Sequence, residues 1–312
     1  MKQSLKFLIT ATLLMTLIYL FFGLVSGLEM YFLSLRATKL IAMVLASVAV
    51  GYSSTSFQTL TNNHILTPSI MGLDSLYLLL QTVVIFFLGS HSLKMMSETS
   101  DFLLSIGLMV GFSLILFKRF LKGQTQNIYI MVLVGMVLGQ LFSGVSTFLQ
   151  VLMDPNEFDT LQTRMFASFS NVNTSLLLIG TIITILVILY AIADFQTLDV
   201  LSLGRDVAIN LGVDYQQIVL KTFILISILV AVSTALVGPL SFLGVIVTSL
   251  SRKLANTYKH STRILYAVVI GILFLVSSTL LIERVFNNST TLGVLINFIG
   301  GMTFLYLLIK ER

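Results

Sequence analysis

Long apolar stretches alternate with short polar connections along the whole chain. The apolar runs cover residues 7–27, 40–57, 69–88, 102–117, 128–153, 176–193, 218–237, 240–250, 264–282 and 292–309. A helix needs roughly 20 apolar residues to cross a bilayer core about 30 Å thick. The runs are apolar on all sides, whereas the strands of a membrane barrel alternate apolar and polar residues. The pattern predicts an all-α polytopic membrane protein, with about ten transmembrane helices in one domain over residues 1–312.

Two of the runs leave alternatives open. The first follows Lys2 and Lys6 as a signal peptide would, but it is about 20 residues long and lacks an Ala-x-Ala cleavage site. We expect it to remain as a span. The eighth run, residues 240–250, is too short for an ordinary crossing. It is expected to be tilted, continuous with residues 251–254, or partly re-entrant.

The composition excludes several classes of protein. Hydrophobic residues make up 56% of the chain and charged residues 10%, and the mean hydropathy is +1.00. Soluble domains carry roughly 25% charged residues, so this chain cannot cover a water-facing surface. Disordered, collagen-like and nucleic-acid-binding chains are excluded by the same comparison. The chain has no cysteine, so it forms neither disulfides nor thiolate metal sites.

The basic residues indicate the orientation of the chain. Alternation from a cytoplasmic N-terminus places most of the 18 Lys and Arg residues in cytoplasmic segments, as the positive-inside rule requires. The external segments then hold only Arg36, Lys39, Lys94, Arg164 and Arg284. Both termini are therefore expected to be cytoplasmic, and the net charge of +5 reflects orientation and not nucleic-acid binding.

Motifs of catalysis are missing from the sequence. It contains no phosphate-binding loop and no dinucleotide fingerprint, and His64, His91 and His260 lie in three connections without the spacing of a metal site. We predict that the chain is not an enzyme and binds no metal. Only Asp74 falls within a predicted span, near its cytoplasmic end, where we expect a solvated or capping residue. Ion-coupled carriers need buried carboxylates, so the driving energy is expected to come from a partner protein.

The segment from Arg36 to Gly72 joins a helix rich in small residues to a polar end. Small residues by themselves indicate a closely packed helix. The segment also resembles the second-span region of FecCD-type permeases, the membrane subunits of ABC importers for iron chelates and cobalamin. Their pattern is R-x-P-R, a small-residue helix ending in Gln, then N-P-L-A-x-P and a Gly. The matching residues are Arg36, Gln58, Asn63, Pro68 and Gly72, while Thr38, Lys39, His64 and Leu66 replace motif residues.

The longest cytoplasmic connection carries a second match. About residues 195–216 we expect two short helices broken at Gly204 and Gly212, with Ala208 and Leu211 on one face. The segment resembles the family's L-x-L-G-x-x-x-A-x-x-L-G-V. The resemblance implies a coupling helix that docks on an ATPase through Leu203, Gly204, Arg205, Ala208, Leu211 and Gly212. A surface loop that lies on lipid headgroups is the alternative.

Two further matches lie in the C-terminal third. Residues 238–247, with Gly238 and Gly244, resemble the family's G-x-I-x-F-V-G-L-I-V. The family continues with P-H-x-x-R, of which only Arg252 is kept. The ending, residues 300–308, resembles G-x-P-x-F-x-x-L-L. The matches follow one another in the family's order from Arg36 to the C-terminus.

The resemblance implies a role and a set of partners. The chain is expected to be one permease of an ABC importer for a ferric siderophore in the bacterial cytoplasmic membrane. Its partners would be a second permease, a paralogue more than an identical copy, two ATP-binding subunits and an extracytoplasmic binding protein. ATP and Mg²⁺ would be bound by the ATPase, and this chain would hold no cofactor. Haem or cobalamin are alternative cargoes, and an ion-driven secondary transporter is the alternative of another class.

The resemblance also assigns candidate residues outside the coupling segment. Arg36, Lys39 and Arg284 stand at family positions that receive acidic residues of the binding protein, although each could pair with lipid phosphate instead. The family's path for cargo is lined by the fifth and last spans. Gln140 and Asn297 are therefore candidates for the translocation path, while the glycines beside them fit a close-packing face equally well.

Overall fold

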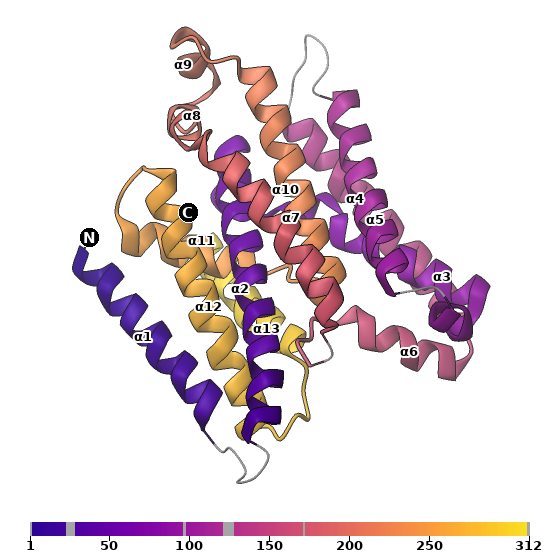
Figure 1. Cartoon of the computed structure of the whole chain (residues 1–312). Helices are drawn as coiled ribbons and strands as arrows, with labels where there is room; N and C mark the ends of the chain where they lie inside the picture. Colours follow the sequence, from indigo (N-terminus) through magenta and orange to yellow (C-terminus); the bar gives the residue numbers. More distant parts are fainter. Residues whose placement is uncertain (1, 23–28, 96–97, 121–127, 171, 311–312) are drawn as a thin grey trace.

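The computed structural model describes residues 2–22, 29–95, 98–120, 128–170 and 172–310. Regular structure in these ranges is entirely helical (Figure 1). The helices are α1 Lys2–Phe21, α2 Glu29–Leu60, η1 Pro68–Met71, α3 Leu73–Met95, α4 Glu98–Phe120, α5 Ile128–Val151, α6 Pro155–Met165, α7 Thr174–Ile192, α8 Phe195–Leu201, α9 Arg205–Asn210, α10 Tyr215–Val237, α11 Leu243–Ala255, α12 His260–Arg284 and α13 Leu292–Lys310. Residues 23–27 of the first apolar run, and the side chains of His91 and Lys94, lie outside the described part of the chain.

Each predicted apolar run corresponds to one helix, which confirms an all-helical, multi-pass membrane protein. Within the described residues, seven helices are long and apolar enough to cross a bilayer, and shorter apolar helices cover Leu73–Gly89 and Leu292–Tyr306. The eighth run forms α11, which continues through residues 251–254 to Ala255, one of the expected alternatives. Its 13 residues rise only about 20 Å. This helix is too short to cross a bilayer core alone.

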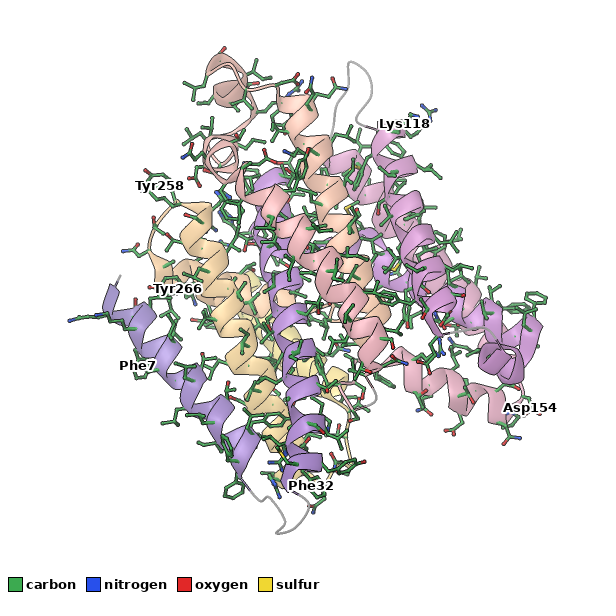
Figure 2. The ribbon with its side chains drawn as sticks, viewed as in Figure 1. Phe7, Phe32, Lys118, Asp154, Tyr258 and Tyr266 are labelled. Atoms are coloured by element: carbon green, nitrogen blue, oxygen red, sulfur yellow. The ribbon has the colours of Figure 1, made fainter. Side chains whose placement is uncertain are left out.

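The connections gather at two opposite ends of the bundle. Lys118 and Tyr258 lie at one end, and Phe32 and Asp154 lie at the other (Figure 2). The short helices α8 and α9 project from the first end, and the amphipathic α6 lies at the second (Figure 1). This arrangement agrees with the predicted alternation, in which the α8–α9 end is cytoplasmic and the α6 end is external.

The centre of the bundle is built on the small residues of α2. Its Ala42, Ala46 and Ala49 are fully buried. A Cβ on Gly51 would lie 3.2 Å from the backbone nitrogen of Val268 in α12, and one on Gly271 would lie 3.1 Å from Ser47. Small side chains let helix backbones approach closely in a membrane. The close packing expected for the second span is therefore present.

Two helix interruptions are held by glycines of the family motifs. Pro68 begins η1, and Gly72 follows it with φ +80°, where an added Cβ would lie 2.7 Å from the Cα of Gly139. Gly238 has φ +90° and ends α10, and a Cβ there would lie 3.1 Å from the Cα of Ala167. The left-handed region strongly favours glycine. These positions therefore shape the chain at its two interruptions.

Candidate functional site

The segment at about residues 195–216, which the sequence predicts to be cytoplasmic, consists of two short helices separated by glycines, as predicted. Gly204 has φ +101° at the start of α9, and Gly212 has φ +84° after its end. Ala208 is fully buried, whereas Leu211 is 62% exposed. Of the two side chains predicted to share a face, only Ala208 is therefore packed against the protein. The Leu211 N–H still bonds to the Val207 carbonyl at 3.0 Å, so this residue closes the last turn of α9.

Apolar side chains are exposed on this projecting segment. Leu203 is 61% exposed, and Val207, Ile209 and Leu211 are exposed as well. The segment lies at the end of the bundle where cytoplasmic connections gather (Figure 1). Clustered apolar side chains at a water-facing end mark an interaction surface. Two of these four residues, Leu203 and Leu211, belong to the set that the sequence assigned to ATPase docking.

The base of the segment is fixed by a buried histidine. The Asp199 carboxylate in α8 accepts hydrogen bonds from the His260 backbone N–H and from His260 Nδ1, both at 2.6 Å. His260 Nε2 lies 2.7 Å from Thr59 Oγ1 near the end of α2. The side chain of His260 is fully buried. The start of α12 thereby joins α8 to α2, a connection that sequence reasoning missed because it tested the histidines only as metal ligands.

Other contacts fix α8 to α10 and α2. Lys221 of α10 forms an ion pair of 2.6 Å with Asp194, the residue before α8, and its ammonium lies 4.0 Å from the centroid of the Tyr190 ring. Phe195 of α8 stacks on Tyr52 of α2 at 6.3 Å between ring centroids. The segment predicted to be the coupling segment therefore stands on a platform made of α2, α10 and α12.

The motif residues at the end of α2 connect that helix to α11. Gln58 Nε2 donates to Thr248 Oγ1 at 2.8 Å, and Arg252 donates to Gln58 Oε1 at 2.9 Å and to the His64 carbonyl at 3.1 Å. Asn63 Oδ1 accepts from the backbone N–H of Ile65 at 3.0 Å and stabilises the turn that follows α2. Gln58 and Arg252, separate motifs in the sequence, form one contact.

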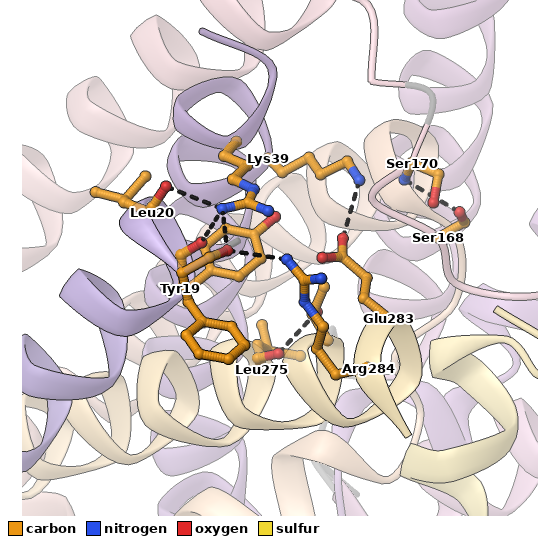
Figure 3. A network of polar contacts seen from close by, with 11 residues as sticks. Tyr19, Leu20, Lys39, Ser168, Ser170, Leu275, Glu283 and Arg284 are labelled. Carbon is orange, nitrogen blue, oxygen red and sulfur yellow. Dashed lines mark hydrogen bonds and ion pairs between the residues drawn. The ribbon is translucent and has the colours of Figure 1, made fainter. Parts of the chain in front are cut away.

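The three predicted docking residues meet where α1, α2 and α12 converge, at the end of the bundle predicted to be external. Figure 3 shows Lys39 and Arg284 there. Arg36 donates to the carbonyls of Tyr19, Leu20 and Phe22 at 2.9–3.0 Å. Arg284 also donates to the Phe22 carbonyl, at 2.9 Å. The last carbonyls of a helix have no partner within it, and cations are favoured there. Both arginines therefore bind the C-terminal end of α1.

Lys39 differs from the two arginines in its partner. It forms an ion pair of 3.2 Å with Glu283 of α12, and both side chains are partly exposed. Figure 3 shows the lysine and the glutamate pointing toward each other beside Ser168 and Ser170. A cavity of about 310 Å³ borders this pair and Arg36. The structure thus brings the three residues together and gives each one a partner within the chain.

A larger external cavity lies between α3, α4, α6 and α10. It measures about 450 Å³. Arg164 of α6 lines it and donates to Asp101 and to Gln81, both at 2.6 Å. Asn173 and Glu98 form another contact at its rim. Arg164 was identified from the sequence only as an external cation, because nothing in the pattern indicated the carboxylate that it meets.

The two candidates for the translocation path lie on exposed helix faces. Gln140 of α5 and Asn297 of α13 are both exposed. The nearby glycines of α5 lie on a different face of the helix, because Gly135 and Gly139 pack against Met71 and Gly72. Close packing explains those glycines, and the polar residues occupy another face of their helix.

Asp74 differs from the sequence expectation. It is 7% exposed and begins α3 beside Thr234, which lies in the last turn of α10. That end of α10 is far along the helix from the cytoplasmic α8–α9 end, so Asp74 is neither solvated nor near the cytoplasm. The expectation failed because α3 begins inside the bundle, after the η1 interruption.

Comparison with known proteins agrees with this geometry. YclO of Bacillus subtilis strain 168, a petrobactin import system permease protein, is 47% identical over 100% of this chain and 99% of its own. The Bacillus anthracis petrobactin import system permease proteins FatC and FatD are 39% and 28% identical over 89% and 96% of this chain, and 78% and 87% of their own. A metal-chelate type ABC transporter described in an inward-facing conformation has the same fold, with a TM-score of 0.87 at 21% identity over 99% of this chain and 100% of that one. The model of the FecCD transport family matches residues 5–310, and the chain belongs to that family.

Proposed function

We propose that this chain is one permease subunit of an ABC importer that carries a ferric siderophore of the petrobactin class across the bacterial cytoplasmic membrane. Family membership supports the transport role, and the printed names of YclO and FatC support the cargo. The chain is a permease subunit and does not itself hydrolyse ATP. ATP and Mg²⁺ would be held by two separate ATP-binding subunits, and no cofactor by this chain.

Ten crossings fit the described helices when the interruption before α11 is counted with that helix. The 13 residues of α11 rise about 20 Å. The non-helical residues 238–240 add at most about 3.4 Å each. Together they reach about 30 Å, the thickness of a bilayer core. The single permease domain then spans residues 1–312, with the coupling segment at about 195–216 on the cytoplasmic side.

The main support for the proposal is the coupling segment, which has exposed apolar side chains at its tip and a base that is fixed to the bundle. Leu203 and Leu211 are available to a partner, while Asp199 and Asp194 tie the same segment to α12 and α10. A movement imposed by an ATPase on the tip would pass to the ends of α2, α10 and α12. Such a movement biases a bundle between two arrangements, which is what alternating access requires.

The partners follow from the same assignment. FatC and FatD are both permease proteins of one import system in Bacillus anthracis, which supports a paralogue as the second permease here. An extracytoplasmic binding protein would deliver the cargo to the external face, where Arg36, Lys39 and Arg284 gather.

Uptake by the complete importer in proteoliposomes tests the function. We expect ferric petrobactin to accumulate when ATP is enclosed and to continue accumulating after the proton gradient is collapsed. Uptake that needs the gradient and ignores ATP would identify an ion-driven carrier instead. Haem and cobalamin, offered in the same assay with their own binding proteins, test the alternative cargoes.

A further inference from the structure

The two helix interruptions meet around a single buried carboxylate. Asp74 lies in the first turn of α3, next to η1, and the second interruption separates α10 from α11. Its carboxylate accepts hydrogen bonds from Ser241 at 2.7 Å and from Thr234 at 3.3 Å, and the Ser69 hydroxyl lines the cavity beside it. The three hydroxyls come from η1, α10 and the interrupted segment. Asp74 therefore holds together the parts of the bundle that lack helical continuity.

A small cavity adjoins this carboxylate. Its volume is about 20 Å³, enough for one water-sized guest. Hydroxyl side chains line it together with Asp74, namely Ser53, Ser54, Ser69, Ser233, Thr234 and Ser241. Ser53 is fully buried, and its Oγ has no hydrogen-bond partner among the described residues. An unpartnered buried hydroxyl beside a carboxylate indicates that a polar guest belongs in the cavity.

The charge of the site favours a cation as the guest. No Lys, Arg or His lines the cavity, and no ion pair of the described residues includes Asp74. The hydroxyl groups can donate to both carboxylate oxygens, which suits the ionised group because it only accepts hydrogen bonds. A lone negative charge inside a bilayer is costly, and either a proton or a bound cation neutralises it. The hydroxyl bonds offset only part of that cost.

We propose that this cavity binds one Na⁺ ion, held by Asp74 and the surrounding hydroxyl oxygens, with Ser53 as a ligand. One carboxylate balances a monovalent cation, and hard cations prefer oxygen ligands. The cavity is small, which favours Na⁺ over K⁺. Unwound segments of discontinuous helices are where membrane transporters coordinate Na⁺. The ion would lock η1, α3 and α10 to the interrupted segment without being transported.

Sodium-dependent stability of the full-length chain in detergent tests the site. NaCl is titrated against N-methyl-D-glucamine chloride at constant ionic strength, and the temperature of half-aggregation is followed by size-exclusion chromatography. We expect the temperature to rise by a few degrees along a saturable curve, as binding to the folded state alone requires. KCl in place of NaCl should give little of this rise. An equal temperature in all three salts contradicts the proposal and indicates that the guest is water.

Two serine variants of α2 test whether Ser53 coordinates the ion. Ser53→Ala should weaken the apparent Na⁺ affinity about fivefold, the effect of losing one polar contact. Ser56→Ala is the matched control, because Ser56 is also fully buried on α2 but does not line the cavity. Equal Na⁺ curves for Ser53→Ala and Ser56→Ala would overturn the assignment of Ser53.

A substitution of the carboxylate tests the charge. Asp74→Asn should remove the Na⁺ dependence, since the amide keeps the size of the side chain and loses its charge. If that variant does not purify, the wild-type titration and the pair of serine variants still decide the matter. The readout is stability of this chain alone. Failure of the sodium site therefore leaves ATP-driven uptake untouched, and failure of the transport assignment leaves the sodium response unchanged.

Discussion

The two ends of the bundle use polar side chains in different ways. At the cytoplasmic end, the buried contacts of Asp199 and Asp194 fix a segment whose apolar tip stays exposed. At the external end, Arg36 and Arg284 are themselves the fixing contacts, because they bind the carbonyls that end α1. Candidate docking residues are thus separate from the supporting residues at one end and identical with them at the other. A substitution can therefore isolate docking cleanly only at the cytoplasmic end.

The largest effect is expected at the cytoplasmic tip. Leu203→Asp and Leu211→Asp place a charge where an apolar contact with the ATPase is proposed. Central contacts of an interface contribute about 2 kcal/mol or more, so we expect uptake and recovery of the ATPase with the permease to fall more than tenfold. Exposed substitutions change stability by only about 0.5 kcal/mol, so the amount of inserted chain should stay constant.

The control for the tip comes from the same end of the molecule. Tyr258 is 67% exposed and lies outside the coupling segment. Tyr258→Asp should leave uptake and complex assembly as they are. Equal losses for all three variants would show that the cytoplasmic end responds to charge in general and that the leucines are not a docking surface.

Substitutions inside the same segment act differently. Ala208 is fully buried, so a bulky charged residue there should displace α9 as well as its surface. Gly204 has φ +101° and ψ 162°, a conformation that is nearly restricted to glycine and costs other residues about 1–3 kcal/mol. For Ala208→Glu and Gly204→Glu we expect ATP hydrolysis without uptake, measured on the purified complex. Normal transport-stimulated hydrolysis in both variants would refute the coupling assignment.

The next effect concerns the base of the coupling segment. His260→Leu removes both ring nitrogens and leaves Asp199 with only the backbone N–H of residue 260. Loss of a buried hydrogen-bond partner costs about 1–3 kcal/mol. We expect uptake to fall several-fold while the tip still binds the ATPase, because the platform and not the docking surface is changed. The ratio of ATP hydrolysed to cargo transported should rise, and His260→Gln should restore part of the coupling.

The helices and their order could be predicted because each apolar run is a long, continuous stretch of the sequence. The interruptions at 61–72 and 238–242 were only partly predictable, since the motif glycines marked them but their meeting around Asp74 depends on the third dimension. The contact between Asp199 and His260 joins residues 61 apart, and Arg36 bonds to carbonyls whose positions no side-chain pattern reveals. Local periodicity predicts elements, whereas the partner of a polar side chain is set by packing between them.

A smaller effect, with a distinct salt dependence, is expected at the external end. Arg36→Gln and Arg284→Gln remove charged donors from the end of α1 but retain polar side chains. Hydrogen bonds from a charged group contribute about 1.5–3 kcal/mol each. Because these hydrogen bonds are lost, we expect the thermal stability of the chain to fall at every ionic strength. Lys39→Gln, which loses a partly exposed ion pair, should lower stability by less than about 1 kcal/mol.

Docking at the same residues would have another signature. Contacts between charges at the rim of an interface act on association and weaken as salt rises. If these residues receive the binding protein, Lys39→Glu should reduce its capture at low ionic strength, and a reversed acidic residue on the binding protein should restore part of it. Capture that is unchanged at low salt, together with the stability loss of the arginine variants, would leave the external cluster with a purely structural role.

The smallest effect is expected from substitutions that test the translocation path, which would run between the two ends of the bundle. Gln140→Cys and Asn297→Cys change exposed side chains, so stability should change by only about 0.5 kcal/mol. A polar path would let water-soluble thiol reagents reach both cysteines in the assembled importer, and the chain has no native cysteine to interfere.

Two further cysteine variants on α5 serve as controls. Leu141→Cys replaces a side chain next to Gln140 that is 56% exposed, and Ser146→Cys replaces one that is 3% exposed. Labelling of positions 140 and 297 together with protection of positions 141 and 146 would place the path on one face of α5. Protection of Gln140→Cys in every nucleotide state would instead put that face against lipid or against the second permease.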